Sequence, residues 1–124
     1  MAISNSNPSV LSATTLLKDK VVNSKGEELG KIEEFMIDLA SGRIIYAVLS
    51  FGGFLGMGSK LFAVPWEALK LDTENKRFVL DVDKERLKDA PGFDKNDWPN
   101  QPDVEWLSKV YTYYGASPYW KDRS

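Results

Sequence analysis

The spacing of hydrophobic and polar positions predicts six short strands in the first two thirds of the chain. Segments rich in Gly, Asn, Asp and Ser, which favour turns, separate these strands. The predicted strands cover residues 20–23, 29–39, 43–51, 60–64, 70–72 and 77–82. Residues 44–51 are apolar on both alternating faces, apart from Ser50. A strand with one face in water would alternate, so we expect this strand to be covered on both sides or to lie in a closed, highly curved sheet.

Local sequence features predict how the strands bend and end. The period of two fails where Glu33 and Glu34 stand side by side, which predicts a β-bulge or a sharp bend. In the next connection, Asp38 is placed to cap a hairpin turn and Gly42 to take its left-handed position. Pro65 has no amide hydrogen, so the fourth strand should stop there or run along an edge.

Short helices are predicted on either side of the strands. Residues 1–11 are rich in Ser and Asn and are interpreted as a flexible tail, after which Ser12 is placed to cap one helical turn. Asp83 is placed to cap a short helix over residues 84–89. Residues 92–102 have the composition of a loop.

A longer helix is predicted after Asp103, through Tyr114, with Gly115 placed to stop it. Three of its apolar residues form one stripe, because they are spaced by four and then three positions. This stripe and two aromatic residues beyond the helix form a candidate interaction surface, made of Trp106, Val110, Tyr113, Tyr119 and Trp120. The surface would pack on the same chain or on a neighbouring subunit, and the sequence leaves both alternatives open.

The composition excludes several kinds of chemistry. The chain has no Cys and no His, so it can form no disulfide, thiolate nucleophile, imidazole base or His-ligated metal site. We therefore predict no catalytic residue, no metal and no cofactor. The net charge is -2, with 16 basic side chains scattered among 18 acidic ones, which does not favour nucleic-acid binding.

The sequence also gives no signal for export or membrane insertion. Its first residues lack the basic start and the long apolar core of a signal peptide. The longest nearly apolar run, residues 44–49, is far shorter than a membrane span. We therefore expect a cytoplasmic protein without a membrane span.

The connection between the third and fourth predicted strands is both glycine-rich and apolar. Residues 52–58 contain four glycines together with Phe54, Leu55 and Met57. A phosphate-binding loop would need a helix after it, whereas here a strand follows. Burying each apolar side chain is worth about 1.5–3 kcal/mol, so the loop favours contact with another surface. That surface is either the chain's own core or a protein partner, and both alternatives remain open.

Two acidic patterns have ordinary structural interpretations. Glu33 and Glu34 are neighbours on a strand and point to opposite faces, so they do not flank one substrate unless a bulge redirects them. Residues 94–97 resemble the start of a calcium loop, but the later oxygen ligands and the closing glutamate are missing. We interpret the first as solvated surface and the second as a turn.

Several short motifs follow one another in an order that is specific as a whole. They are Gly26-Glu27-Glu28-Leu29-Gly30-Lys31-Ile32, Ile37-Asp38, Gly42-Arg43-Ile44, Val48 and Val64-Pro65-Trp66-Glu67-Ala68-Leu69. In this order they resemble the PRC-barrel domain, which is named for the cytoplasmic part of the photosynthetic reaction-centre H subunit and also forms part of a ribosome-maturation factor. The further run from Phe51 to Asp94 looks like a stand-alone bacterial subgroup of that family.

The resemblance implies a mainly β fold. We expect a small six-stranded PRC-type β-barrel over residues 12–82, followed by a short α-helical, aromatic C-terminal extension over residues 83–124. The family has no shared catalytic residue, and known members act as docking or assembly surfaces. The positions that carry the structural motif are Gly30, Asp38, Gly42, Pro65 and Trp66.

The favoured functional hypothesis is a non-enzymatic protein-interaction or assembly module. It would bind an unidentified protein partner or form a homodimer or larger oligomer, through the apolar loop and the aromatic C-terminal segment. One alternative is an RNA- or ribosome-associated assembly factor, although the chain lacks the separate N-terminal domain of the maturation factor. The last alternative is a barrel for a small ligand, which ranks lowest because barrels of this size are usually filled by side chains.

Overall fold

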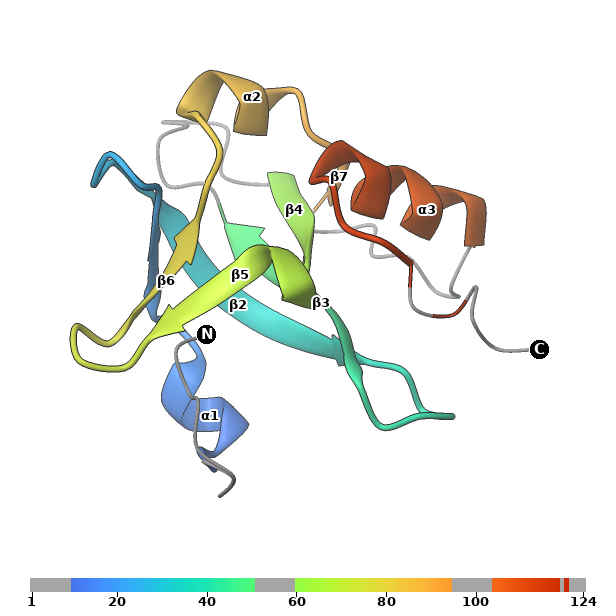
Figure 1. Ribbon diagram of the computed structural model, residues 1–124, viewed down its shortest axis with the longest axis horizontal. Coiled ribbons are helices and arrows are strands. Elements are labelled where there is room, and N and C mark those ends of the chain that lie inside the picture. The colour runs from blue at the N-terminus through green and yellow to red at the C-terminus, as the bar shows by residue number, and fades with distance from the viewer. Residues whose placement is uncertain (1–9, 51–59, 95–103, 119, 121–124) are drawn as a thin grey trace.

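The computed structural model describes residues 10–50, 60–94, 104–118 and 120. Its elements in chain order are α1 (Ala13–Leu16), β1 (Lys20–Val22), β2 (Glu28–Ile37), β3 (Ile44–Ser50), β4 (Lys60–Pro65), η1 (Trp66–Ala68), β5 (Leu69–Asp72), β6 (Arg77–Leu80), α2 (Lys84–Lys88), β7 (Gly92–Asp94) and α3 (Val104–Tyr113) (Figure 1). Some predictions lie outside the described residues, namely the start of the N-terminal tail, Phe54, Leu55, Met57, residues 95–97, the Asp103 cap and Tyr119.

All six predicted strands are present, and each end lies within two residues of its predicted place. A seventh strand, β7, occupies the start of the segment that was predicted to be a loop. That prediction is wrong there, because Gly92 to Asp94 pairs with the first residues of β4. This pairing depends on tertiary structure rather than on the local sequence.

The seven strands form one sheet in the order β5-β6-β1-β2-β3-β4-β7. Neighbouring strands are antiparallel except for β1 and β6, which are parallel. The sheet curves strongly, so that β5 and β6 face β2 and β3 (Figure 1). Among the described residues, the edge strands β5 and β7 do not pair with each other, so the curved sheet is not closed.

The prediction of a closed six-stranded barrel is therefore wrong, whereas a mainly β fold with a C-terminal helix is confirmed. The chain leaves the sheet at Pro65, which has no amide hydrogen to continue the ladder. The one-turn helix η1 then directs it into β5 on the far edge. On the other flank, β7 pairs only with the first half of β4, so no described strand bridges the two edges.

A β-bulge at Glu33 bends β2. The pairing with β3 shifts by one residue between Ile32 and Glu34. Because of the extra residue, Ile32 and Phe35 both face the inside of the sheet although they are three positions apart. The bulge predicted from the two adjacent glutamates is confirmed.

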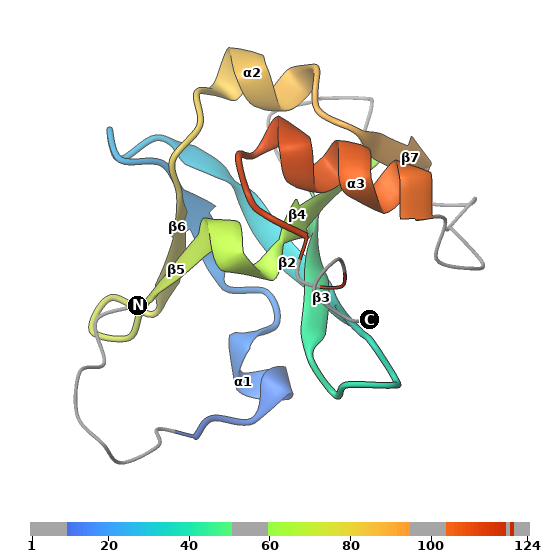
Figure 2. The same ribbon diagram turned by 45° about the vertical axis from the view of Figure 1, so that its right-hand side comes forward.

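Two apolar cores lie on opposite faces of β3 and β4. The inner core, within the curve of the sheet, consists of Val21, Leu29, Ile32, Phe35, Ala47, Leu49, Phe62, Val64, Phe78, Leu80, Leu87 and Ala90. The outer core, between these strands and α3, consists of Tyr46, Val48, Leu61, Ala63, Leu107, Val110 and Tyr111. Figure 2 shows α3 lying across β4 on this side. The prediction that the third strand is covered on both sides is confirmed.

The β2–β3 turn has the geometry that the sequence predicted. The amide groups of Gly42 and Ala40 donate to the Asp38 carbonyl and carboxylate oxygens at 2.7 and 3.1 Å. Gly42 has a φ of +76°, a left-handed conformation that side chains disfavour. The turn is therefore fixed by these two residues together.

The helix ends agree with the sequence in part. Ser12 caps α1 by accepting a hydrogen bond from the Thr15 amide, and α3 ends before Gly115, whose φ is +73°. Asp83 stands at the N-cap position of α2, but its side chain makes no capping hydrogen bond. The predicted side-chain cap is wrong, because the Asp83 carboxylate pairs with Lys25 instead.

Candidate functional site

A half-open groove of about 590 Å³ lies beside β2, and we call it the β2 groove. Its described lining residues are Glu28, Leu29, Gly30, Lys31, Glu33, Ser50 and Lys84. They come from β2, the last residue of β3 and the first residue of α2. The groove therefore gathers charged and polar side chains from three separate parts of the chain.

Gly30 and Ser50 bring the backbones of β2 and β3 unusually close at the groove. A Cβ atom on Gly30 would lie 1.9 Å from the Ser50 carbonyl oxygen, which no side chain can accommodate. Glycine is required here because β3 occupies the space of the missing side chain. The sequence had marked Gly30 as a motif position, and this contact supplies its physical role.

Glu33 forms one charged wall of the groove and is held by two neighbours. Its carboxylate accepts a hydrogen bond from Ser50 Oγ at 2.7 Å and pairs with Lys18 Nζ. Partial burial acts to raise the pKa of Glu33, but these two contacts outweigh it. The nearby charge of Lys31 acts in the same direction, so the pKa of Glu33 lies below its ordinary value. Glu33 is therefore an ionised, internally balanced group.

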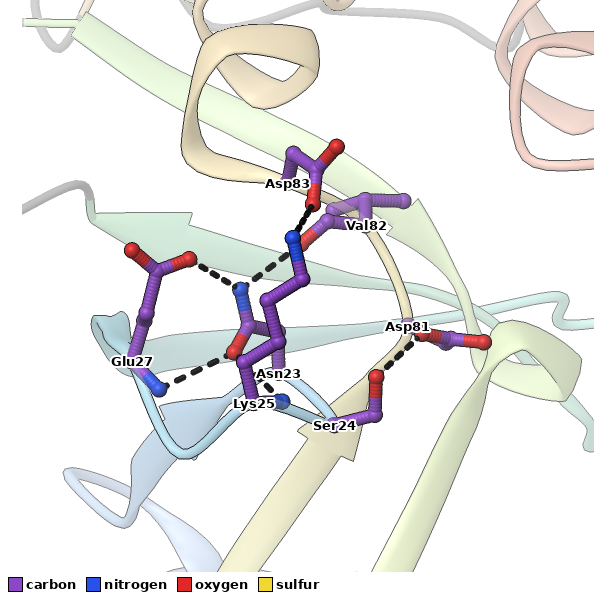
Figure 3. Close-up of polar contacts among 7 residues, drawn as sticks. All are labelled: Asn23, Ser24, Lys25, Glu27, Asp81, Val82 and Asp83. Atoms are coloured by element: carbon purple, nitrogen blue, oxygen red, sulfur yellow. Dashed lines mark hydrogen bonds and ion pairs between the residues drawn. The ribbon is translucent and has the colours of Figure 1, made fainter.

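A cluster around Asn23 fastens the β1–β2 turn to the chain after β6 (Figure 3). The buried Asn23 side chain donates to Glu27 Oε1 at 2.7 Å and to the Val82 carbonyl at 3.2 Å. Its carbonyl oxygen accepts from the Lys25 and Glu27 amides. The amide thus uses both donors and both acceptor sites, which leaves no capacity for a ligand. The role of Asn23 is structural.

Two further contacts complete this fastening. Ser24 Oγ donates to Asp81 Oδ1 at 2.8 Å, and Lys25 Nζ lies 3.3 Å from Asp83 Oδ1 (Figure 3). Glu28 follows this turn in the sequence and Lys84 follows Asp83, so the cluster sets the positions of both groove residues. Sequence reasoning missed the groove, because the only local signal was the turn composition around Asn23.

The charges on the groove are not all balanced within the chain. Lys31 and Lys84 form no ion pair with another described residue, and neither does Glu28. Together with Lys18, the partner of Glu33, the charged side chains at the groove are three lysines and two glutamates, an excess of one positive charge. In the described part of the chain, no group of three or more acidic side chains is placed to hold a metal ion.

A comparison with protein families matches residues 8–87 to the PRC-barrel domain, which is more than half of the chain. The chain belongs to the PRC-barrel family. PRC-barrel domains are generally non-catalytic modules. A comparison with curated proteins gives no match. All described lining residues of the β2 groove lie within the matched PRC-barrel residues, whereas β7 and α3 lie beyond them.

Helix α3 and the chain after it cover their own PRC-barrel sheet with several of the C-terminal residues that the sequence singled out. Val110 has no exposed surface and belongs to the outer core. Trp106 is half-buried, with its ring edge-to-face against Tyr46 and Phe93. Trp120 is also half-buried and packs against the Tyr111 ring, with centroids 4.8 Å apart. These side chains therefore bury much of their apolar surface through contacts within their own chain.

Tyr113 joins α3 to α2. Its hydroxyl donates to the Arg86 carbonyl, while the Arg86 guanidinium donates to the Tyr113 carbonyl. The guanidinium also lies 4.5 Å from the centre of the Tyr113 ring, a cation–π distance. The adjacent Tyr114 contacts both cores. The end of α3 is thus fixed to the PRC-barrel domain at several points.

The remaining motif residues are structural. Pro65 is buried at the end of β4, where it faces Tyr46 of β3. The Trp66 ring lies edge-to-face against Phe35 and Phe78, with centroids 5.7 and 6.0 Å away. These contacts close one end of the inner core and leave little of the motif available for a ligand. Within the described residues, no helix is both long and apolar enough to span a membrane.

Exposed apolar side chains that the sequence did not single out lie at the far end of β3. Leu39, in the β2–β3 turn, is 94% exposed, and Ile37 is 54% exposed. Val10 and Leu11, just before α1, are exposed as well. In both views α1 and the β2–β3 turn extend from the same end of the molecule (Figures 1 and 2). The sequence had placed Ile37 and Leu39 in a predicted strand, and Val10 and Leu11 in the predicted N-terminal tail.

Proposed function

We propose that this PRC-barrel chain is a non-enzymatic interaction module that associates with a protein partner, in the first place a second copy of itself. The observation that supports this is the place where the apolar loop begins. Ser50 is the last residue of β3 and lines the β2 groove, and residues 52–58 follow it directly in the sequence. The apolar loop and the polar groove therefore start from one place in the fold.

The C-terminal residues support the proposal less directly. Val110 is already buried against its own sheet, and Tyr113 is bound to α2, so neither has much apolar surface left to offer. Trp106, Trp120 and Tyr119 would contribute at the rim. We assign the main contact to Phe54, Leu55 and Met57, because burial of apolar side chains is the strongest general drive for association.

The test is the solution mass by light scattering of the wild type and of Phe54→Ser combined with Leu55→Ser. We expect a wild-type dimer or larger oligomer that becomes a folded monomer in the double variant. Circular dichroism checks that the variant stays folded. Its matched control is Ile37→Ser with Leu39→Ser, which removes two exposed apolar side chains at the other end of β3.

Two outcomes would contradict the proposal. A wild-type monomer would remove self-association, and pull-down experiments would then test for a different protein. An oligomer that dissociates only in the Ile37 and Leu39 variant would place the contact at the opposite end of the molecule.

A further inference from the structure

We propose that the β2 groove binds a carboxylate side chain on an extended segment of a protein partner. This inference rests on the proposed interaction function and adds to it the chemistry of the partner. The groove volume of about 590 Å³ is large enough for a few residues of an extended chain and too small for a folded element.

The charge of the groove selects an anionic group. Lys31 and Lys84 line it from two different elements, and neither forms an ion pair with another described residue. The described lining also carries Glu28, which forms no ion pair with a described residue, and Glu33, which is paired with Lys18 and lies near the charge of Lys31. The groove is thus locally positive on a chain whose net charge is -2. A carboxylate in the groove would form a charge-assisted hydrogen bond with one of these lysines.

The same lining disfavours nucleic acid. Glu28 lines the groove without an ion pair to another described residue, and its carboxylate would repel the phosphates of a polyanionic strand. A polypeptide carries backbone amide groups between its acidic side chains, and these amides can donate to the Glu28 carboxylate. A mixed groove of two lysines and a free carboxylate therefore fits an acidic peptide better than a continuous row of phosphates.

The groove is also fixed before any partner arrives. At one end, the Asn23 cluster holds Glu28 and Lys84 in place through contacts to residues 81–83. At the other end, the close approach of Gly30 to Ser50 fixes β2 against β3. A site whose walls are already positioned loses little conformational freedom on binding, which favours affinity even for a short segment.

The experiment is an amide ¹H–¹⁵N NMR titration of the full chain with two capped hexapeptides. One alternates glutamate with glycine, and the other has glutamine in place of glutamate. We expect the glutamate peptide to shift the amides of Gly30, Lys31, Glu33 and Ser50 and to bind about tenfold more tightly than the glutamine peptide. Raising the salt concentration should weaken only the glutamate peptide, because exposed charges are screened.

A pair of charge-matched variants locates the site. Lys31→Glu with Lys84→Glu should weaken the glutamate peptide by about tenfold, since each exposed charge pair is worth about threefold. The control, Lys70→Glu with Lys109→Glu, changes the net charge equally at exposed positions outside the groove and should bind as the wild type does. Equal loss in both variants would overturn the proposal, because it would show a general charge effect.

Other results would overturn it as well. Equal binding of the two peptides would exclude carboxylate recognition, and a single-stranded oligoribonucleotide that shifts the same amides more strongly would make the groove a nucleic-acid site. Failure here is distinguishable from failure of self-association. A wild-type oligomer that ignores the glutamate peptide retains the proposed function without this inference, and a monomer that binds the peptide as described retains the groove alone.

Discussion

The outer faces of β3 and β2 belong to adjacent strands of one sheet, yet one is covered and the other is open. On β3, Tyr46 and Val48 face outward and are buried under α3. On β2, Lys31 and Glu33 face the groove and keep their contact with solvent. The comparison shows that the residues on the outer face of a strand determine whether another element packs over it. Apolar side chains are stabilised by burial under a helix, whereas charged side chains would need a partner if they were buried.

The covered face should tolerate a charge far less than its exposed counterpart. Val110→Asp would place a carboxylate in the outer core without a partner, and we expect it to cost about 4 kcal/mol in the free energy of unfolding. Thr112→Asp, two positions away on the exposed side of α3, should change the stability by less than about 0.5 kcal/mol. Urea denaturation measures both. Similar values would mean that α3 does not depend on the outer core for its position.

On β2, the open side, the fold depends on a backbone position rather than on a buried side chain. Gly30→Ala would force a Cβ against the Ser50 carbonyl at a residue whose φ of +155° side chains also disfavour, and we expect a loss of about 3 kcal/mol in the free energy of unfolding. Gly42→Ala is the control, because its φ is +76° but no atom lies within 4 Å of the added Cβ. It should cost about 1 kcal/mol, from the left-handed conformation alone. Thermal unfolding of both variants would show how much the close approach at Gly30 adds to the backbone strain that both substitutions introduce.

Tyr111 on α3 and Tyr114 just after this helix refine the description of the covered side. The Tyr111 hydroxyl donates to the Ile45 carbonyl at 2.6 Å, so Tyr111→Phe should cost about 1 kcal/mol. The buried Tyr114 hydroxyl has no hydrogen-bond partner in the described structure, and burial raises the pKa of Tyr114 well above its ordinary value. Tyr114→Phe should therefore leave the stability unchanged or raise it by up to about 1 kcal/mol. Chemical denaturation measures both variants. A loss of stability in Tyr114→Phe but not in Tyr111→Phe would contradict this description.

The smallest effect concerns the open side and depends on pH. The pKa of Glu33 is lower in the folded chain than in the unfolded one, so ionised Glu33 adds stability at neutral pH. This contribution disappears as the pH falls from about 5 to about 2, because the carboxylate takes up a proton. Glu33→Gln should therefore lose less than about 1 kcal/mol at pH 7 and nothing at pH 2.

The control for this pH series is Glu34→Gln, which removes the exposed neighbouring carboxylate of β2. Denaturation of the wild type and both variants at several pH values gives the comparison. A wild-type advantage over Glu33→Gln that grows in acid would mean that folding raises the pKa of Glu33 instead of lowering it.

Local features of the fold could be predicted from the sequence because neighbouring residues determine them. The apolar residues on both faces of 44–51 required two covers, and the paired glutamates required a bulge at Glu33. The turn at Asp38 and Gly42 follows from the conformations that these residue types favour. Val110, one of the three apolar residues of the predicted C-terminal stripe, is buried in the outer core, as its spacing along the helix predicted.

The features that could not be predicted all depend on distant pairing. Strand β7 is three residues long and begins with glycine, so only its partner β4 identifies it as a strand. The open sheet follows from where β5 and β7 end, which no local pattern encodes. The groove brings together Glu28 and Lys84, which are far apart in the sequence. The salt bridge between Lys25 and Asp83, which replaces the predicted helix cap, also joins residues that are far apart in the sequence.

The position of β1 inside the sheet, between β6 and β2, has a consequence for how the protein is made. The strand is synthesised early, but its parallel neighbour β6 follows only after most of the matched domain has been synthesised. Helix α3 follows later still, so a nascent chain carries the apolar outer faces of β3 and β4 without their cover. At about 5–20 residues per second this interval lasts on the order of seconds, in which chaperones and aggregation compete for the same surface.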